Sequence, residues 1–175
     1  HNWHYYSQYS QNSFHNKSLI RCFHNKTSLY LQYINEKSIF LNLKSSNKRE
    51  FLQDLAQKAS EVTGIDALSI FDSVLERENL GSTGFGSGTA LPHSRFSGLD
   101  KVYAFFAKPS YILDFDAIDG KPVDLVFLLV SPENSGADHL TALAMLSRIL
   151  KDENICNKLR QMTKPTEIYA LLNEA

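Results

Sequence analysis

The sequence predicts an α/β domain in which a central β-sheet is covered by helices on its faces. Three observations lead to this prediction: helical periodicity over residues 48–81, a group of strand-like segments over 102–130, and helical periodicity again after residue 138. Helices before and after a cluster of strands are typical of a layered α/β fold. A chain of 175 residues suits a single domain of this kind.

The domain is expected to span residues 29–175, after an extension of different composition. Residues 1–28 are rich in His, Asn, Ser, Gln and Tyr, follow neither a helical nor a strand period, and lack the apolar core of a signal peptide. This composition favours a flexible or artefactual extension. The alternative is an arm that docks through its aromatic residues.

The first elements of the domain can be placed in order along the chain. Alternating apolar residues predict a strand over 39–43, and the capping-box pattern that starts at Asn47 predicts a helix that ends at Gly64. Asp66 is expected to cap a second helix, which ends near Gly81.

A cluster of strands is predicted after a glycine-rich run. Residues 102–108 and 111–115 have high β-propensity, and residues 117–122 have the composition of a turn. Residues 124–130 are nearly all apolar, which indicates a strand buried on both faces.

Three helices are predicted to complete the chain. Asp138 is expected to cap the first of them, and two short helices should follow around residues 155–159 and 168–172. The buried side of the first helix is expected to consist of Leu140, Leu143, Ala144, Ile149 and Leu150.

Charge and composition limit the classes of function. A formal net charge of −1 argues against a surface that binds nucleic acid or an acidic membrane. No apolar run approaches the ~20 residues that span a bilayer, so membrane insertion is not expected. The cysteines, Cys22 and Cys156, form no framework or paired motif, which fits a reducing cytoplasm.

Half of the eight glycines lie between Gly81 and Gly88. Backbone N–H groups at Gly84, Gly86 and Gly88 would suit an anion, above all a phosphate. The run is neither a Walker A loop, since no Gly-Lys-Ser/Thr follows, nor a dinucleotide fingerprint, since a helix precedes it rather than follows it. The alternative is a glycine-rich hairpin without a ligand.

Two histidines of the regular part are candidate catalytic residues. His93 follows Pro92, which stiffens the backbone, and an imidazole beside free N–H groups suits a histidine that carries a phosphoryl group. His139 stands at a predicted helix start, where an anion is favoured. The alternatives are a structural role for His93 and a surface position for His139.

Arg77 is the candidate cation for this phosphate. It lies just before the glycine run, within the stretch Leu-Glu-Arg-Glu. The alternative is a solvated charge on a helix, paired with Glu76 or Glu78.

These residues lie in three motifs through which the chain resembles the type 2 IIA family of the bacterial phosphotransferase system, and within it the nitrogen-regulatory branch. The resemblance covers residues 30–172. The motifs are LERENLGSTGFGSGTALPHSR (75–95), FDAIDGKPVDLVFLLVSP (115–132) and ADHLTALAMLSRIL (137–150).

The resemblance implies a mixed sheet and assigns the site. His93 would accept the phosphoryl group, with His139 and Arg77 as its active-site partners. Ser94 stands where the family usually has Gly or Ala, and its hydroxyl is a candidate phosphate contact. Phe85 and Phe96 flank the site in the sequence as candidates for partner docking, although core packing is an equal alternative for both.

The expected activity is a phosphohistidine relay, an enzyme only in the broad sense of a phosphotransferase system component. The donor would be a small histidine-phosphocarrier protein, and the phosphorylation state would control transporters or kinases. No metal or organic cofactor is expected. The alternatives are a sugar-specific IIA component for fructose or mannitol, a binding module that is never phosphorylated, and a metal hydrolase using His93, His139 and Asp138.

Overall fold

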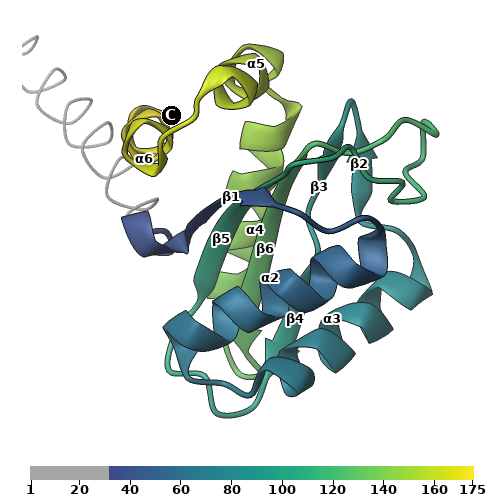
Figure 1. The fold of residues 1–175 in the computed structure, drawn as a ribbon. Coiled ribbons are helices and arrows are strands. Elements are labelled where there is room, and N and C mark those ends of the chain that lie inside the picture. Colours follow the sequence, from purple (N-terminus) through teal and green to yellow (C-terminus); the bar gives the residue numbers. More distant parts are fainter. Residues whose placement is uncertain (1–31) are drawn as a thin grey trace, which may run out of the picture.

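The computed structural model describes residues 32–175. The predicted extension at residues 1–28 lies outside this part, so the domain boundary stays a prediction. Within residues 32–175, six strands form one mixed sheet with helices on both faces, which confirms the predicted fold class (Figure 1). The elements in chain order are η1 (Glu36–Ser38), β1 (Ile39–Leu43), α2 (Lys48–Thr63), α3 (Ala67–Leu80), β2 (Gly84–Gly86), β3 (Thr89–Ala90), β4 (His93–Phe96), β5 (Tyr103–Pro109), β6 (Leu125–Pro132), α4 (Ala137–Lys151), α5 (Glu153–Gln161) and α6 (Pro165–Glu174).

The sheet is built around β6, the strand predicted to be buried on both faces. The strand order is β1-β5-β6-β3-β2, and β4 also pairs with β6. β5 runs antiparallel to β6, whereas β3 and β4 both run parallel to it. β3 and β4 therefore lie one after the other along the same side of β6.

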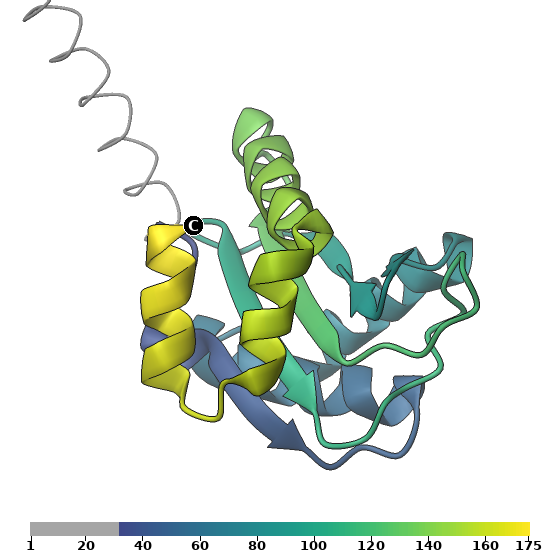
Figure 2. The same ribbon diagram turned by 90° about the horizontal axis from the view of Figure 1, so that it is seen from above.

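Helices cover the two faces of the sheet and create two cores. In Figure 2, α4, α5 and α6 lie on one side of the sheet, and α2 and α3 lie on the other. Because side chains alternate along a strand, neighbouring residues of β5 and β6 belong to different cores. Phe106 and Phe127 pack under α4 to α6, whereas Phe105 and Leu128 pack under α2 and α3.

Caps fix the ends of the helices that precede the site. The Asn47 side chain accepts a hydrogen bond from the Glu50 N–H at 2.9 Å, and Gly64 ends α2 with a φ of 75°. The predicted capping box is incomplete, because the Glu50 carboxylate accepts from the N–H of Ser46 rather than of Asn47. Asp66 caps α3 through the Ser69 N–H, as predicted.

The prediction of a strand over 111–115 is wrong. Leu113 and Phe115 are buried, but the segment makes only an isolated antiparallel bridge between Leu113 and Val123. The high β-propensity of this segment therefore reflects buried apolar side chains in a loop rather than a strand of the sheet. The turn predicted over 117–122 is present, with the Gly120 N–H donating to the Ala117 carbonyl at 2.9 Å.

Two predictions for α4 also need correction. Gly136 stands at the N-cap, and Asp138 lies inside the first turn without capping it. Leu140 is 61% exposed and Ala144 is exposed too. The face of α4 that packs on the sheet consists of His139, Ala142, Met145, Leu146, Ile149 and Leu150. A histidine thus occupies the first buried position of the helix. Among residues 32–175, no helix combines the length and apolar character needed to cross a bilayer.

Candidate functional site

The candidate site lies where β3 gives way to β4 at the edge of the sheet. Leu91 and Pro92 separate the two strands, and the Pro92 carbonyl still accepts a hydrogen bond from the Leu129 N–H at 3.0 Å. Proline has no N–H to donate, so the sheet pairing is interrupted here. His93 starts β4 opposite Leu129. This register turns the His93 side chain toward the α4 side of the sheet.

A backbone carbonyl fixes the His93 ring. Its Nδ1 lies 2.8 Å from the Leu91 carbonyl oxygen. Because a carbonyl oxygen only accepts, the neutral ring carries its proton on Nδ1 and its lone pair on Nε2. Partial burial lowers the pKa of His93, and the charge of Arg77 lowers it further, against the opposing effect of the Leu91 bond. The ring is therefore held neutral with Nε2 ready to act as a nucleophile.

His139 faces His93 from the first turn of α4. The two ring centroids are 5.9 Å apart at an interplanar angle of 53°. Nδ1 of His139 lies 2.7 Å from Oγ of Ser131, a buried residue of β6. Burial, followed by the charge of Arg95, lowers the pKa of His139 to about 4, and the neighbouring His93 ring would oppose a second proton as well. This imidazole is thus also neutral, and its Nε2 has no partner among the described hydrogen bonds.

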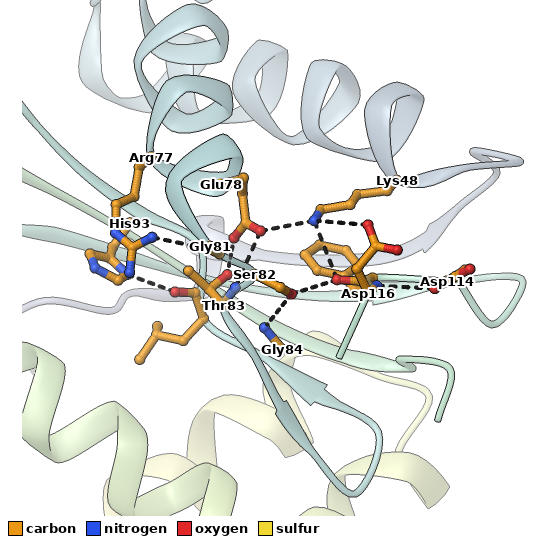
Figure 3. A network of polar contacts seen from close by, with 12 residues as sticks. Lys48, Arg77, Glu78, Gly81, Ser82, Thr83, Gly84, His93, Asp114 and Asp116 are labelled. Atoms are coloured by element: carbon orange, nitrogen blue, oxygen red, sulfur yellow. Dashed lines mark hydrogen bonds and ion pairs between the residues drawn. The ribbon is translucent and has the colours of Figure 1, made fainter. Parts of the chain in front are cut away.

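Arg77 reaches the same place from the other face of the sheet. It lies in the last turn of α3, and its Nη1 donates to the Gly81 carbonyl at 3.0 Å. Figure 3 draws the guanidinium in front of the His93 ring, and the two are close enough for the charge of Arg77 to lower the pKa of His93. The alternative pairing of Arg77 with Glu78 does not occur, because Glu78 pairs with Lys48. The structure thus brings together the three residues that the sequence assigned to catalysis.

Arg95 is a member of this site that the sequence analysis did not identify. It lies two residues after His93 on β4, so both side chains belong to the same face of the strand. Its register partner is Ser131, the residue that holds His139. Its positive charge contributes to the lowered pKa of both histidines. Strand alternation from His93 is the signal that would have found it.

The glycine run is a hairpin, which was the alternative to a phosphate loop. Gly86 and Gly88 flank its tip, where the Ser87 N–H donates to the Asp119 carboxylate at 2.8 Å. The tip lies beside Leu125, whereas His93 lies beside Leu129. Four residues of strand correspond to about 13 Å. Gly86 and Gly88 are therefore too distant to bind a phosphate on His93.

The remaining predicted phosphate contacts also point elsewhere. The Gly84 N–H donates to Oγ of Ser82 at 3.1 Å, so this donor already has a partner. Ser94 lies on the opposite face of β4 from His93, and its Oγ forms a hydrogen bond with Oγ of Ser73 in α3. Neither residue faces the space between the two imidazoles.

The two phenylalanines proposed for docking have different environments. Phe96 is 8% exposed and packs in the core under α2 and α3, so the packing role that was its alternative is the correct one. Phe85 is 41% exposed, but it lies on the glycine hairpin. The exposed apolar residues next to the site are instead Leu80, which follows Arg77 by three residues, and Leu140, which follows His139.

A metal centre finds no support in the described part of the chain. Within residues 32–175, no group of three or more His, Cys, Asp or Glu side chains is arranged to hold a metal ion. Asp138, the third ligand of the hydrolase alternative, belongs to no such group. The arrangement that is present combines a nucleophilic imidazole, a second imidazole and two guanidinium groups, which suits a transferred anion.

The chain is similar to known proteins of one family. Residues 32–175 match the family described as "Phosphoenolpyruvate-dependent sugar phosphotransferase system, EIIA 2". The chain is 45% identical over 136 residues to a nitrogen regulatory protein of Bradyrhizobium diazoefficiens, covering 78% of this chain and 89% of that protein. It is 38% identical over 125 residues to the fructose-specific EIIA component of Haloferax volcanii, covering 71% and 80%. The crystal structure of nitrogen regulatory protein IIA-Ntr from Neisseria meningitidis has a TM-score of 0.76 at 30% identity, covering 81% of this chain and 97% of that one.

Proposed function

Because the chain belongs to the EIIA type 2 family of the phosphoenolpyruvate-dependent sugar phosphotransferase system, and to its nitrogen regulatory group, we propose that His93 accepts a phosphoryl group from a phosphohistidine on a small carrier protein. The observation that carries this proposal is the 2.8 Å bond from Nδ1 of His93 to the Leu91 carbonyl, which leaves the Nε2 lone pair free.

The transfer step follows from this geometry. The lone pair on Nε2 of His93 attacks phosphorus, and the P–N bond of the carrier breaks with its electron pair returning to the carrier's imidazole. The proton on Nδ1 stays in place, held by the Leu91 carbonyl. Phosphoryl transfer needs in-line positioning and stabilisation of charge on the equatorial oxygens. Arg77 and Arg95 supply that charge, and an Nε2–H of His139 donates to a phosphoryl oxygen.

Neutral imidazoles are an advantage for this reaction. A protonated His93 has no lone pair to attack with, so its lowered pKa keeps the nucleophile available at neutral pH. The lowered pKa of His139 keeps that ring able to act as a neutral donor through one nitrogen while it contacts Ser131 through the other. The positive charge of the site is then carried by the two arginines.

The carrier is proposed to dock on the surface around these residues. Leu80, in the same helical turn as Arg77, and Leu140, next to His139 in the chain, are exposed apolar residues that take the docking role expected of Phe96. Such a surface suits a small interface that releases its partner after transfer. The phosphorylation state of His93 would then control the binding of transporters or kinases, in keeping with the name of the nitrogen regulatory relative.

A sugar-specific role is the second candidate, favoured by the fructose-specific relative. In that case the phosphoryl group would pass from His93 to a IIB domain. The two roles differ in the acceptor, so phosphorylated protein should be mixed with a fructose-type IIB domain. Rapid loss of the label from His93 to that domain would favour sugar uptake, and a stable label would favour regulation.

Labelling with a radioactive phosphoryl donor tests the proposal itself. The protein is incubated with phosphoenolpyruvate, the first enzyme of the system and an active carrier. We expect a label that is acid-labile and base-stable and that is absent from His93→Ala. An unlabelled wild-type protein beside a labelled carrier would contradict the proposal and favour the unphosphorylated binding module.

A further inference from the structure

A buried ion pair lies behind the site, in the part of the structure drawn in Figure 3. Glu78 of α3 has a side chain only 1% exposed, and its Oε2 lies 2.9 Å from Nζ of Lys48, which starts α2. Nζ of Lys48 also donates to the Phe115 carbonyl at 3.3 Å. Burying a carboxylate is costly unless it is paired and fully hydrogen-bonded, so the contacts of Glu78 define what it does.

The other partner of Glu78 is the loop that leads to the glycine hairpin. The N–H of Thr83 donates to Oε2 of Glu78 at 3.2 Å, and Oγ1 of Thr83 donates to Oε1. Thr83 is itself buried. The carboxylate thus holds one residue by both its main chain and its side chain.

Thr83 connects this ion pair to the reactive histidine. Its carbonyl accepts a hydrogen bond from the Leu91 N–H at 3.0 Å, and the Leu91 carbonyl in turn accepts from Nδ1 of His93 at 2.8 Å. At Thr83 and at Leu91, the bond that the N–H donates and the bond that the carbonyl accepts belong to different peptide groups. The contacts therefore fix the position of the Leu91 carbonyl and do not relay charge. Leu91 lies in the break between β3 and β4. Among the described hydrogen bonds, its carbonyl accepts only from this imidazole.

We infer that Glu78, fixed by Lys48, is a positioning residue for His93: through Thr83 it holds the Leu91 carbonyl that keeps the imidazole proton on Nδ1. This inference rests on the proposed function of His93 for its biological meaning, but the tautomer itself is a property of the unphosphorylated protein. Two consecutive residues at the end of α3 therefore have different roles. Arg77 reaches the phosphoryl group, and Glu78 orients its acceptor.

The alternative, that the ion pair only stabilises the fold, makes a different prediction. A buried ion pair is often no more stabilising than apolar side chains of the same volume. If Glu78 served stability alone, its loss would lower the free energy of unfolding without changing the tautomer of a histidine that it does not touch. The tautomer of His93 therefore separates the two roles.

The test is the ¹⁵N spectrum of the imidazole nitrogens in wild type, Glu78→Gln and Asp124→Asn. Asp124→Asn is the matched control, because Asp124 forms an ion pair with Arg160 at 2.8 Å and has no described bond to Leu91 or Thr83. The His93 signals are assigned by their loss in His93→Asn. In wild type, Nδ1 should have the shift of a protonated nitrogen and Nε2 that of an unprotonated one.

In Glu78→Gln we expect Nε2 to move toward the shift of a protonated nitrogen, since a ring without its carbonyl partner exchanges between tautomers. Only the Nδ1–H form has a lone pair on Nε2, so the rate of phosphorylation should fall with it. We expect about a tenfold fall, the lower end of the loss seen when the outer hydrogen-bond partner of a metal-bound histidine is removed. Asp124→Asn should leave both the shifts and the rate unchanged.

Unchanged His93 shifts in folded Glu78→Gln, or equal changes in Asp124→Asn, would overturn the inference. If Glu78→Gln does not fold, Thr83→Val removes one of the two bonds while keeping the shape of the side chain, and a folded Thr83→Val with wild-type shifts would overturn it equally. Failure of the proposed function has a different signature. The wild-type protein would then stay unlabelled by an active carrier while Glu78→Gln still alters the tautomer.

Discussion

At the scale of single residues, the site depends on two imidazoles that stay neutral beside two guanidinium groups. Burial is the main reason for neutrality at both rings, because it disfavours the charged form. His93 keeps a carbonyl at Nδ1 and His139 keeps the Ser131 hydroxyl. The second nitrogen of each ring is therefore available for chemistry rather than for structure.

The buried His139 should make stability depend on pH. Its pKa is about 4 in the folded protein and about 6.5 when unfolded, so between these values protons bind preferentially to the unfolded chain. The stabilisation is complete above pH 6.5 and is lost as the pH falls toward 4, by up to about 3 kcal/mol. Urea unfolding between pH 7 and 4.5 should show a steeper loss in wild type than in His139→Gln. Parallel curves for the two proteins would contradict this assignment.

Arg77 should matter for transfer rather than for folding. Its side chain is half-buried and makes one described hydrogen bond, to the Gly81 carbonyl. Arg77→Ala should slow phosphorylation of His93 about a hundredfold, as expected for a lost group that stabilises charge in the transition state. Arg148→Ala, at an exposed residue in the last turn of α4, is the control and should be labelled at the wild-type rate. A fall in Tm of Arg77→Ala well beyond about 4 °C would show a structural role instead.

At the scale of elements, the sequence predicted correctly those features that depend on local hydrogen bonds. The helices α2 and α3 begin and end where Asn47, Gly64 and Asp66 indicated, because caps are local hydrogen bonds. The segment 111–115 was misassigned because β-propensity reports only that its side chains suit a half-buried, extended backbone. Whether such a segment joins the sheet depends on neighbours that are distant in the sequence.

The glycine hairpin is the element for which the structure differs most from the prediction, which was a phosphate-binding loop. Gly88 has a φ of 80°, and a Cβ there would lie 2.8 Å from both the Arg160 guanidinium and the Asp124 carboxylate. Gly88→Ala should lower the free energy of unfolding by about 1–3 kcal/mol through strain and crowding. Gly120→Ala is a control for the backbone effect alone, since its φ is 69° but nothing lies within 4 Å.

The same variant separates a structural hairpin from a phosphate loop. Because the hairpin tip lies four residues of β6 away from His93, folded Gly88→Ala should be phosphorylated at the wild-type rate. Denaturant titration and the labelling assay together make this test. Normal stability with lost labelling would restore the original interpretation of the glycine run.

At the scale of the whole molecule, one sheet serves two cores. Leu55 of α2 and Leu159 of α5 are both fully buried, but on opposite faces. Each substitution by Ala should cost about 2–5 kcal/mol. Since β5 and β6 contribute side chains to both cores, either change should lower the protection of the amides in both strands against hydrogen exchange. Loss of protection on one side only would show that the two layers open independently.

The sequence identified the reactive residues of the site better than the residues that hold them in position. Arg77 and His93 stand in one motif (75–95) and His139 in another (137–150), and the fold brings the three together at the edge of β4. Glu78 was treated only as a surface partner for Arg77, because a helical period near a glycine run does not tell which of two adjacent charges is buried. Its partner Lys48 lies 30 positions earlier, on another helix. Such a contact follows from packing, not from spacing.

The two guanidinium groups have a further meaning for any molecule that senses this protein. With both imidazoles uncharged, Arg77 and Arg95 give the edge of β4 a positive field, and a phosphoryl group carries a charge of about −1.5 to −2 at pH 7. Phosphorylation of His93 would thus neutralise this positive potential rather than change the shape of the surface. A partner that distinguishes phosphorylated from unphosphorylated protein would respond to this loss of electrostatic attraction. Salt that shortens the Debye length below about 8 Å would therefore reduce the difference in its affinity for the two forms.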